Sequence, residues 1–268
     1  MTIDTKLLCE LLVASARSEL MPRFNSCERQ IKHDGTLVTQ ADLAMQHRLT
    51  NELKHHYPRI PLLGEEMSSD HQMAIFNDSN QGFWCLDPLD GTANFVSGMP
   101  CFAVSLAYLV DGEVEIGIIY DPVRDELFHA EKGSGAWLNQ QRLQIDTRLD
   151  QLHECVAMVD FKRLDPPLAT RLATAPPYRS QRSIGSVALD WCWLAAGRFQ
   201  LYLHGGARLW DYAAGRLIFS EAGGHSILSD KSATQADSSR LGLEPKMAVG
   251  AANERLLSAW HSWLKGMG

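Results

Sequence analysis

The spacing of apolar and polar positions predicts two helices at the start of the chain. Leu8, Leu12 and Ser15 recur at helical spacing, so we expect an amphipathic helix over residues 5–20. A second, longer helix is expected over residues 39–57, after a polar stretch that carries turn residues.

Short runs of apolar and β-branched residues then predict strands through the middle of the chain. The expected strands are a short buried one within 59–67, three more at 83–87, 102–110 and 113–122, and a hairpin over 126–139. The pair Asp111-Gly112 lies between two of these runs and is typical of a hairpin turn. The first half is therefore expected to form two helices followed by a largely antiparallel meander.

The second half alternates helix and strand patterns in a mixed order. The expected elements are strands at 156–161, 199–204 and 246–252, and helices at 166–177, 186–198, 210–224 and 253–265. Such an order favours stacked layers of helix and sheet. We expect one domain over residues 1–268, with an N-terminal lobe to about residue 150 and a C-terminal lobe from about residue 151.

Composition narrows the class of protein. The chain has 268 residues, is 45% hydrophobic and carries a formal net charge of -7 with no basic run. A folded core is therefore expected, whereas binding to nucleic acid is not. No apolar stretch reaches the roughly 18 residues of a membrane span. The start of the chain lacks the pattern of a signal peptide. The six scattered cysteines favour buried free thiols and a cytoplasmic location.

Four acidic residues stand where strands end or helices begin. Asp87 and Asp90 lie in the stretch WCLDPLDGTANF, Glu65 follows a short strand, and Asp211 begins a helix. Taken singly, each has an ordinary interpretation, as a turn acid beside Pro88, a helix cap or a solvated side chain. Taken together, they form a set of oxygen ligands of the kind that Mg²⁺ prefers.

The residues after these aspartates suggest a phosphate site. The backbone carbonyl of Leu89 is available as a further oxygen ligand. Gly91, Thr92 and Ala93 form a turn into a short helix, where N–H groups can hold a phosphate oxygen. Carboxylates, metal ions and such a turn together indicate metal-assisted phosphoryl transfer.

The same motifs resemble those of the inositol monophosphatase family. The resemblance is carried by GEE at 64–66, DPLDGTANF at 87–95, WDYAAGRLIFSEAGG at 210–224 and KHDGTLVTQAD at 32–42, in the family's order. It extends from about residue 5 to residue 262. It implies an α+β fold, a layered α/β/α/β/α sandwich with mixed, largely antiparallel sheets. It also implies Mg²⁺-dependent, lithium-sensitive phosphatase activity and a homodimer.

The resemblance assigns the metal ligands residue by residue. Glu65, Asp87 and the carbonyl of Leu89 would hold a first Mg²⁺ ion. Asp87, Asp90 and Asp211 would hold a second, so Asp87 bridges the two. Glu65 would also orient a third, weaker ion.

The resemblance also assigns the residues that act on water and phosphate. Thr92 and Asp42 would polarise the attacking water, with Glu65 as a further catalytic residue. Gly91, Thr92 and Ala93 would bind the phosphate through their N–H groups. Attack on phosphorus would be in line, without a covalent phosphoenzyme.

Two positions depart from the family pattern. Ala93 replaces a threonine, and His204 replaces a glutamate that grips substrate hydroxyls, which makes myo-inositol 1-phosphate a doubtful preferred substrate. His204 can be interpreted as a hydroxyl contact, as a partner for a second phosphate when protonated, or as a strand-end residue without a role. Gly185, Ser186 and Val187 match a segment that lines the family's substrate pocket, although Ser186 also suits a helix cap.

The sequence thus predicts a phosphatase for a small phosphorylated metabolite of the inositol or sugar phosphate class, with two or three Mg²⁺ ions. Two other substrate classes stay open, namely 3′(2′),5′-bisphosphate nucleotides and histidinol phosphate. An alternative of another class is a protein-binding family member with residual catalysis. No nucleic acid and no membrane partner is expected.

Overall fold

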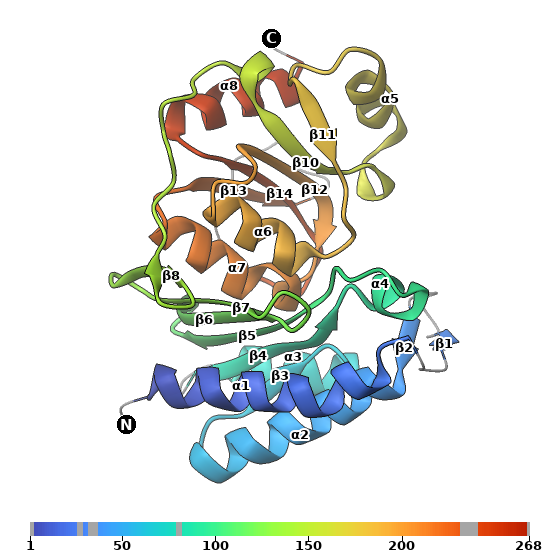
Figure 1. Cartoon of the computed structure of the whole chain (residues 1–268), viewed down its shortest axis with the longest axis vertical. Helices are drawn as coiled ribbons and strands as arrows, with labels where there is room; N and C mark the ends of the chain where they lie inside the picture. The colour runs from blue at the N-terminus through green and yellow to red at the C-terminus, as the bar shows by residue number, and fades with distance from the viewer. Residues whose placement is uncertain (1–2, 26–28, 32–36, 79–81, 231–240, 267–268) are drawn as a thin grey trace.

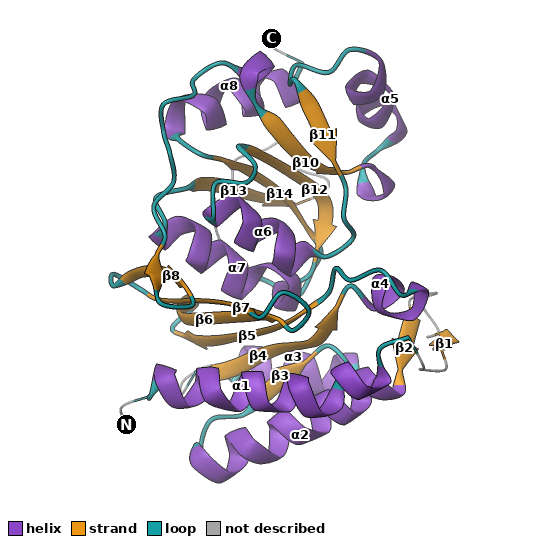
Figure 2. Cartoon of the chain, viewed as in Figure 1, coloured by secondary structure: helices purple, strands orange, loops and turns teal. Residues whose placement is uncertain are grey.

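The computed structural model describes residues 3–25, 29–31, 37–78, 82–230 and 241–266. Its elements stack as helices, a sheet, helices, a second sheet and helices (Figures 1 and 2). The layered α/β/α/β/α arrangement implied by the sequence motifs is therefore confirmed.

The first sheet has seven strands that follow one another in chain order. They are β3 (Leu62–Gly64), β4 (Phe83–Asp90), β5 (Ala103–Val110), β6 (Glu113–Asp121), β7 (Glu126–Glu131), β8 (Gly135–Leu138) and β9 (Gln141–Arg142). Only the β3–β4 pair is parallel, so the predicted antiparallel meander is confirmed. Helices α1 (Thr5–Glu19) and α2 (Gln40–His56) cover its outer face, and α3 (Ser69–Asn77) lies beside β3.

The second sheet has five strands in a non-sequential order. These are β10 (Val156–Asp160), β11 (Ser180–Arg182), β12 (Leu201–Ala207), β13 (His225–Asp230) and β14 (Lys246–Ala251), arranged as β11-β10-β12-β14-β13. Strand β10 is parallel to both β11 and β12, whereas β14 is antiparallel to β12 and β13. The 3-10 turn η4 (Phe161–Arg163) follows β10, and helices α5 (Pro166–Thr174) and α8 (Glu254–Leu264) lie in the outermost layer (Figure 1).

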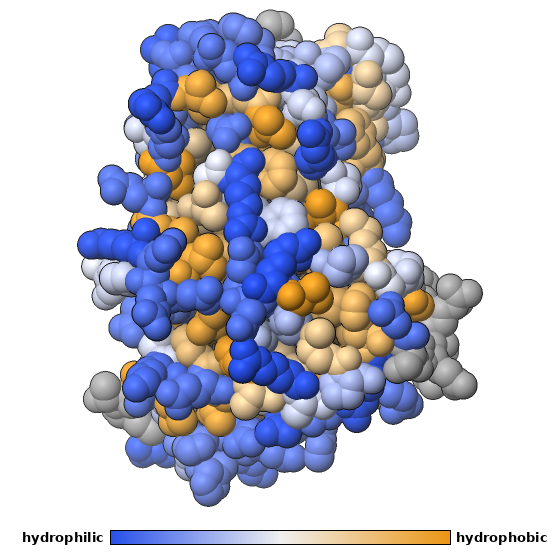
Figure 3. All heavy atoms as spheres, in the orientation of Figure 1, coloured by the Kyte–Doolittle hydropathy of each residue, from blue (hydrophilic) through white to orange (hydrophobic). Residues whose placement is uncertain are grey.

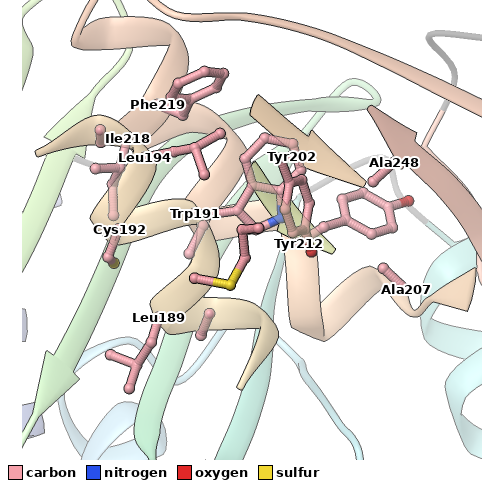
Figure 4. Packing of buried hydrophobic residues seen from close by; sticks show 14 of the residues in the cluster. Leu189, Trp191, Cys192, Leu194, Tyr202, Ala207, Tyr212, Ile218, Phe219 and Ala248 are labelled. Atoms are coloured by element: carbon pink, nitrogen blue, oxygen red, sulfur yellow. The ribbon is translucent and has the colours of Figure 1, made fainter. Parts of the chain in front are cut away.

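Helices α6 (Val187–Ala195) and α7 (Leu209–Glu221) fill the layer between the sheets. Helix α7 approaches β6 so closely that a Cβ at Gly117 would lie 2.6 Å from the carbonyl oxygen of Ala214. The aromatic ring of Trp191 packs against Tyr202 and Phe219, with ring centroids 4.7 and 5.6 Å away (Figure 4). This dense packing fixes the start of α7 relative to the first sheet.

Five short strands were not expected from the sequence. They are β9, β11, β13 and the two strands of a small antiparallel ladder, β1 (Arg29–Ile31) and β2 (Leu37–Thr39). β11 and β13 are edge strands with partly exposed residues, so they lack the continuous apolar run of a central strand. The first half of the predicted motif at 32–42 lies outside the described residues.

Further features of the described residues concern the helices, the cysteines and the surface. Within the described ranges, no helix combines the length and apolar character needed to cross a bilayer. Five cysteines are buried and free, and Cys27 lies outside the described residues. Polar and apolar residues are interspersed on the face shown in Figure 3. Among the described residues, the exposed large hydrophobic side chains are Leu43, Met73 and Met99.

Candidate active site

The end of β4 brings Asp87 and Asp90 to one side of the sheet. Residues three apart in a regular strand point to opposite faces. Here the β4–β5 register shifts between Asp87 and Asp90, and the N–H of Leu89 donates to Asp87 Oδ1 at 3.0 Å. This irregularity turns both carboxylates the same way, as a bulge commonly does beside an active site.

Asp211 meets these aspartates from the other side, at the start of α7. Its Oδ2 accepts the backbone N–H of Arg208 at 2.8 Å, so Asp211 is indeed a helix-capping residue. Asp87, Asp90 and Asp211 each also offer an oxygen atom to a set whose members lie within 4.8 Å of one another. The capping interpretation and the metal-ligand interpretation are therefore compatible.

Asp90 is held by the N-terminus of α6. Its Oδ2 accepts the Ser186 hydroxyl and the backbone N–H of Ala188, the latter at 2.8 Å. Ser186 also caps α6 by accepting the N–H of Leu189. Its hydroxyl, predicted to lie at the substrate, is buried and is bonded to Asp90. Gly185 allows the sharp turn before this helix, with φ of +76°.

Burial and mutual repulsion of crowded carboxylates dominate the electrostatics of the site. Burial, with charge repulsion from neighbouring acids, raises the pKa values of Asp87 and Asp211 well above their usual range. Burial also raises the pKa of Asp90 to about 6, against the opposing hydrogen bonds from α6. The charge of Glu65 contributes to all three shifts, which places it at the same centre. A divalent cation would relieve this repulsion, so the donor set fits Mg²⁺.

Asp42 and Thr92 form the pair predicted from the sequence. Thr92 Oγ1 lies 3.2 Å from Asp42 Oδ1 and 3.0 Å from the carbonyl oxygen of Leu89. Asp42 Oδ2 accepts the N–H and the hydroxyl of Thr39 at 2.8 and 2.6 Å, in the capping box of α2. Burial raises the pKa of Asp42 to about 6, although the Thr39 hydrogen bonds oppose the shift.

The phosphate turn begins at Gly91, which adopts φ of +91°. A Cβ at Gly91 would lie 2.9 Å from the carbonyl oxygen of Cys101, so only glycine fits without movement. Thr92 and Ala93 open the short helix α4 (Thr92–Ser97), whose first N–H groups have no partner within the helix. Asn94 Nδ2 donates to the carbonyl of Ile184 at 2.7 Å and ties α4 to the loop before α6.

His204 lies near this centre but faces a residue that the sequence interpretation missed. It is 4% exposed, and its Nε2 lies 3.1 Å from Oδ2 of Asp160 at the end of β10. Burial opposes ionisation of Asp160, but the hydrogen bonds from His204 and from the backbone N–H of Lys162 help to outweigh it, and the pKa of Asp160 is lowered. The sequence signal that could have identified Asp160 is an acidic residue at the end of an apolar strand, as for the other acidic residues of the site.

Comparisons with known proteins agree with this fold. The sequence profile of the inositol monophosphatase family matches residues 5–263. A protein from Pasteurella multocida, named Nus factor SuhB, is 37% identical over 207 residues, covering 75% of each chain. Inositol monophosphatase 1 of Solanum lycopersicum is 35% identical over 217 residues, covering 78% of each chain. A solved IMPase of Thermotoga maritima superposes with a TM-score of 0.78 and 27% identity, covering 98% of this chain and 99% of its own.

The layered fold and the matching sequence profile place the chain in a phosphatase family with stacked helix and sheet layers. The chain belongs to the inositol monophosphatase family.

Proposed function

We propose that this protein is a Mg²⁺-dependent hydrolase of a small phosphate monoester of the inositol or sugar phosphate class. The observation that carries the proposal is the convergence of Asp87, Asp90 and Asp211 from two separate layers. Asp87 and Asp90 are buried, Asp211 is half-buried, and the pKa values of all three are raised. A protein without a cation to bind gains nothing from three such carboxylates, because their repulsion destabilises the fold.

Two or three Mg²⁺ ions would be held by residues already described. Glu65, Asp87 and the Leu89 carbonyl would hold one, and Asp87, Asp90 and Asp211 another, with Glu65 orienting a third. When bound, Mg²⁺ neutralises the phosphate dianion and lowers the pKa of water.

The chain's own residues would position and deprotonate the nucleophile. The Thr92 hydroxyl, which can donate to Asp42, is free to accept a hydrogen from water. With its pKa raised to about 6, Asp42 is a better proton acceptor than an ordinary aspartate. The N–H groups of Gly91, Thr92 and Ala93 would hold the phosphate in line with that water.

Membership of the family supports further proposals about the substrate side and the cellular setting. Gly185 and Val187 remain predicted for the wall that faces the alcohol, whereas the Ser186 hydroxyl is bonded to Asp90 and the His204 ring to Asp160. We further propose a cytoplasmic homodimer that Li⁺ inhibits, built as one domain with two lobes.

Phosphate release from a panel of esters, with and without Mg²⁺, tests the proposal. The panel holds inositol 1-phosphate, adenosine 3′,5′-bisphosphate, fructose 1,6-bisphosphate, histidinol phosphate and glycerol 2-phosphate. Strong Mg²⁺-dependent release from one ester is expected and would identify the preferred class. Release that does not respond to Mg²⁺, or no release at all, would contradict the proposal.

A second candidate is protein binding with residual catalysis. It is favoured by relatives such as the Pasteurella multocida protein, which is named Nus factor SuhB. Pull-downs with the wild type and with Asp90→Asn separate the two roles. A specific partner retained by the variant, together with negligible release from every ester, would favour the binding role.

A further inference from the structure

His204 and Asp160 form a pair towards the carboxyl ends of two neighbouring strands of the second sheet. The chain leaves β12 at this end and enters α7, which carries Asp211. Strands β10 and β12 are parallel, and Asp160 is the register partner of His204. The carboxyl ends of parallel strands lie at the same edge of a sheet, where open layered folds place their sites. Asp211 follows β12 directly, at the start of α7. The pair therefore lies on the metal-site side of the sheet.

The hydrogen bonds of His204 leave it little to offer a substrate. Its Nδ1 accepts the N–H of Gly206 at 3.2 Å, and its Nε2 lies 3.1 Å from Asp160 Oδ2. This arrangement fixes the neutral tautomer with hydrogen on Nε2. Both ring nitrogens are thus engaged, and the ring is buried.

Asp160, by contrast, is partly exposed and can accept further hydrogen bonds. Its side chain is 25% exposed. Oδ1 accepts the N–H of Lys162 at 3.0 Å and Oδ2 accepts from His204, while a carboxylate has about four acceptor positions. Two of these positions therefore remain for another donor.

The turn that follows Asp160 packs closely against β12, the strand that leads to Asp211. The backbone of Arg163 lies so close to Gly205 of β12 that no Cβ would fit there. The positive charge of Arg163 favours the ionised form of both Asp160 and Asp211. The register with His204 thus places Asp160 beside the strand that leads to Asp211, outside the set Asp87, Asp90 and Asp211.

We propose that Asp160, oriented by His204, is the specificity-determining residue of this site and binds hydroxyl groups of the substrate's alcohol. The inference rests on the proposed phosphatase activity. His204 is then a positioning residue, and the hydroxyl-binding carboxylate stands on β10 instead of β12. A carboxylate next to a neutral imidazole accepts hydroxyl hydrogens but repels a second phosphate group. The site therefore selects polyol monophosphates over bisphosphates.

Matched ester pairs test this assignment. Glycerol 2-phosphate is compared with isopropyl phosphate, and inositol 1-phosphate with cyclohexyl phosphate, so that each pair differs only in hydroxyl groups. The kcat and KM are measured with Mg²⁺, and affinity is measured by calorimetry with Ca²⁺. Asp160→Asn and Asp160→Ala should raise KM and Kd for a polyol ester about tenfold or more, the effect expected for a lost hydrogen bond to a charged group. Values for the hydroxyl-free ester should not change.

Separate variants test the role of His204, and a matched control variant accompanies the Asp160 and His204 variants. His204→Leu should raise KM for the polyol ester with little change in kcat, whereas His204→Gln, which keeps a donor, should restore much of the difference. Asp165→Asn, an exposed acid on the same loop that caps α5, should behave as the wild type.

Equal changes for both members of a pair, or no change in either Asp160 variant, would overturn the inference while leaving the phosphatase intact. If the wild type releases no phosphate but still binds polyol esters more tightly through Asp160, the phosphatase proposal fails and the assignment of Asp160 stands. A wild type that binds the two members of each pair equally overturns the assignment.

Discussion

Replacing Asp90 with asparagine is expected to stabilise the metal-free protein and to remove its response to Mg²⁺. Asp90 is buried among like charges, and its Oδ2 accepts hydrogen bonds from Ser186 and Ala188. Asparagine can keep these two bonds through its own oxygen. The substitution therefore removes the charge and leaves the hydrogen bonds in place.

The size of the effect follows from the pKa of Asp90, which burial raises from 3.8 to about 6. A shift of about two units corresponds to about 3 kcal/mol of unfolding free energy, here lost by the ionised wild type. The raised pKa means that this loss is absent below about pH 4, grows as the pH rises, and is complete above about pH 6. For a chain of this size the gain in Asp90→Asn at pH 7.5 is roughly 5–10 °C in Tm.

Thermal and chemical unfolding in EDTA at pH 4.5 and pH 7.5 measure this gain in stability. A Mg²⁺ titration at pH 7.5 then measures the response of each protein to the metal ion. The wild type should gain stability with Mg²⁺, because a ligand that binds only the folded state stabilises it, and the variant should gain much less. Asp111→Asn is the matched control, since Asp111 is an exposed turn residue with φ of 52°, which asparagine also tolerates.

An Asp90→Asn protein less stable than the wild type at pH 7.5 in EDTA would refute the reasoning. So would a gain of equal size at pH 4.5 and pH 7.5, because the effect would then not arise from ionisation. A variant with the full Mg²⁺ response of the wild type would remove Asp90 from the metal ligands.

Three further predictions concern other residues. Glu65→Gln should stay folded by circular dichroism and lose phosphate release by roughly 100-fold, as expected when a group that stabilises transition-state charge is removed. Asp190 is buried, with Oδ1 unbonded among the described residues and its pKa raised by burial. Asp190→Asn should therefore raise Tm in EDTA more at pH 8 than at pH 4. Gly91→Ala should lower Tm more than Gly112→Ala does. Both residues have positive φ, but only at Gly91 would the Cβ meet backbone, the Cys101 carbonyl oxygen.

The first sheet could be predicted because its signals are local. Its strands follow one another in the chain, and the turn at Asp111-Gly112 joins two of them directly. Neighbouring runs of alternating or apolar residues, separated by short turns, are therefore enough to give both strands and pairing. The order β11-β10-β12-β14-β13 has no such local origin, because β12 lies between strands that are distant in the sequence.

The acidic residues of the site could be found, but their arrangement could not. Each acid stands at a strand end or helix start, which a sequence displays. The common direction of Asp87 and Asp90 depends on a register shift against β5, and the position of Asp211 depends on α7 packing between the sheets. Both features arise from tertiary contacts, which the positions of acidic residues in the sequence do not reveal.

The departure at His204 shows why a changed residue has to be interpreted with its neighbour across the sheet. From the sequence, three interpretations of the histidine at this position stayed open: a hydroxyl contact, a phosphate contact and no role. In the fold, its imidazole is directed at Asp160, which is 44 positions earlier in the chain and adjacent only because β10 and β12 are parallel neighbours. The carboxylate that β12 lacks is thus replaced by one on β10, and the imidazole of His204 on β12 holds that carboxylate in position. The loss of the usual glutamate therefore does not by itself argue against a polyol substrate, since the acceptor needed to bind hydroxyl groups is still present one strand away.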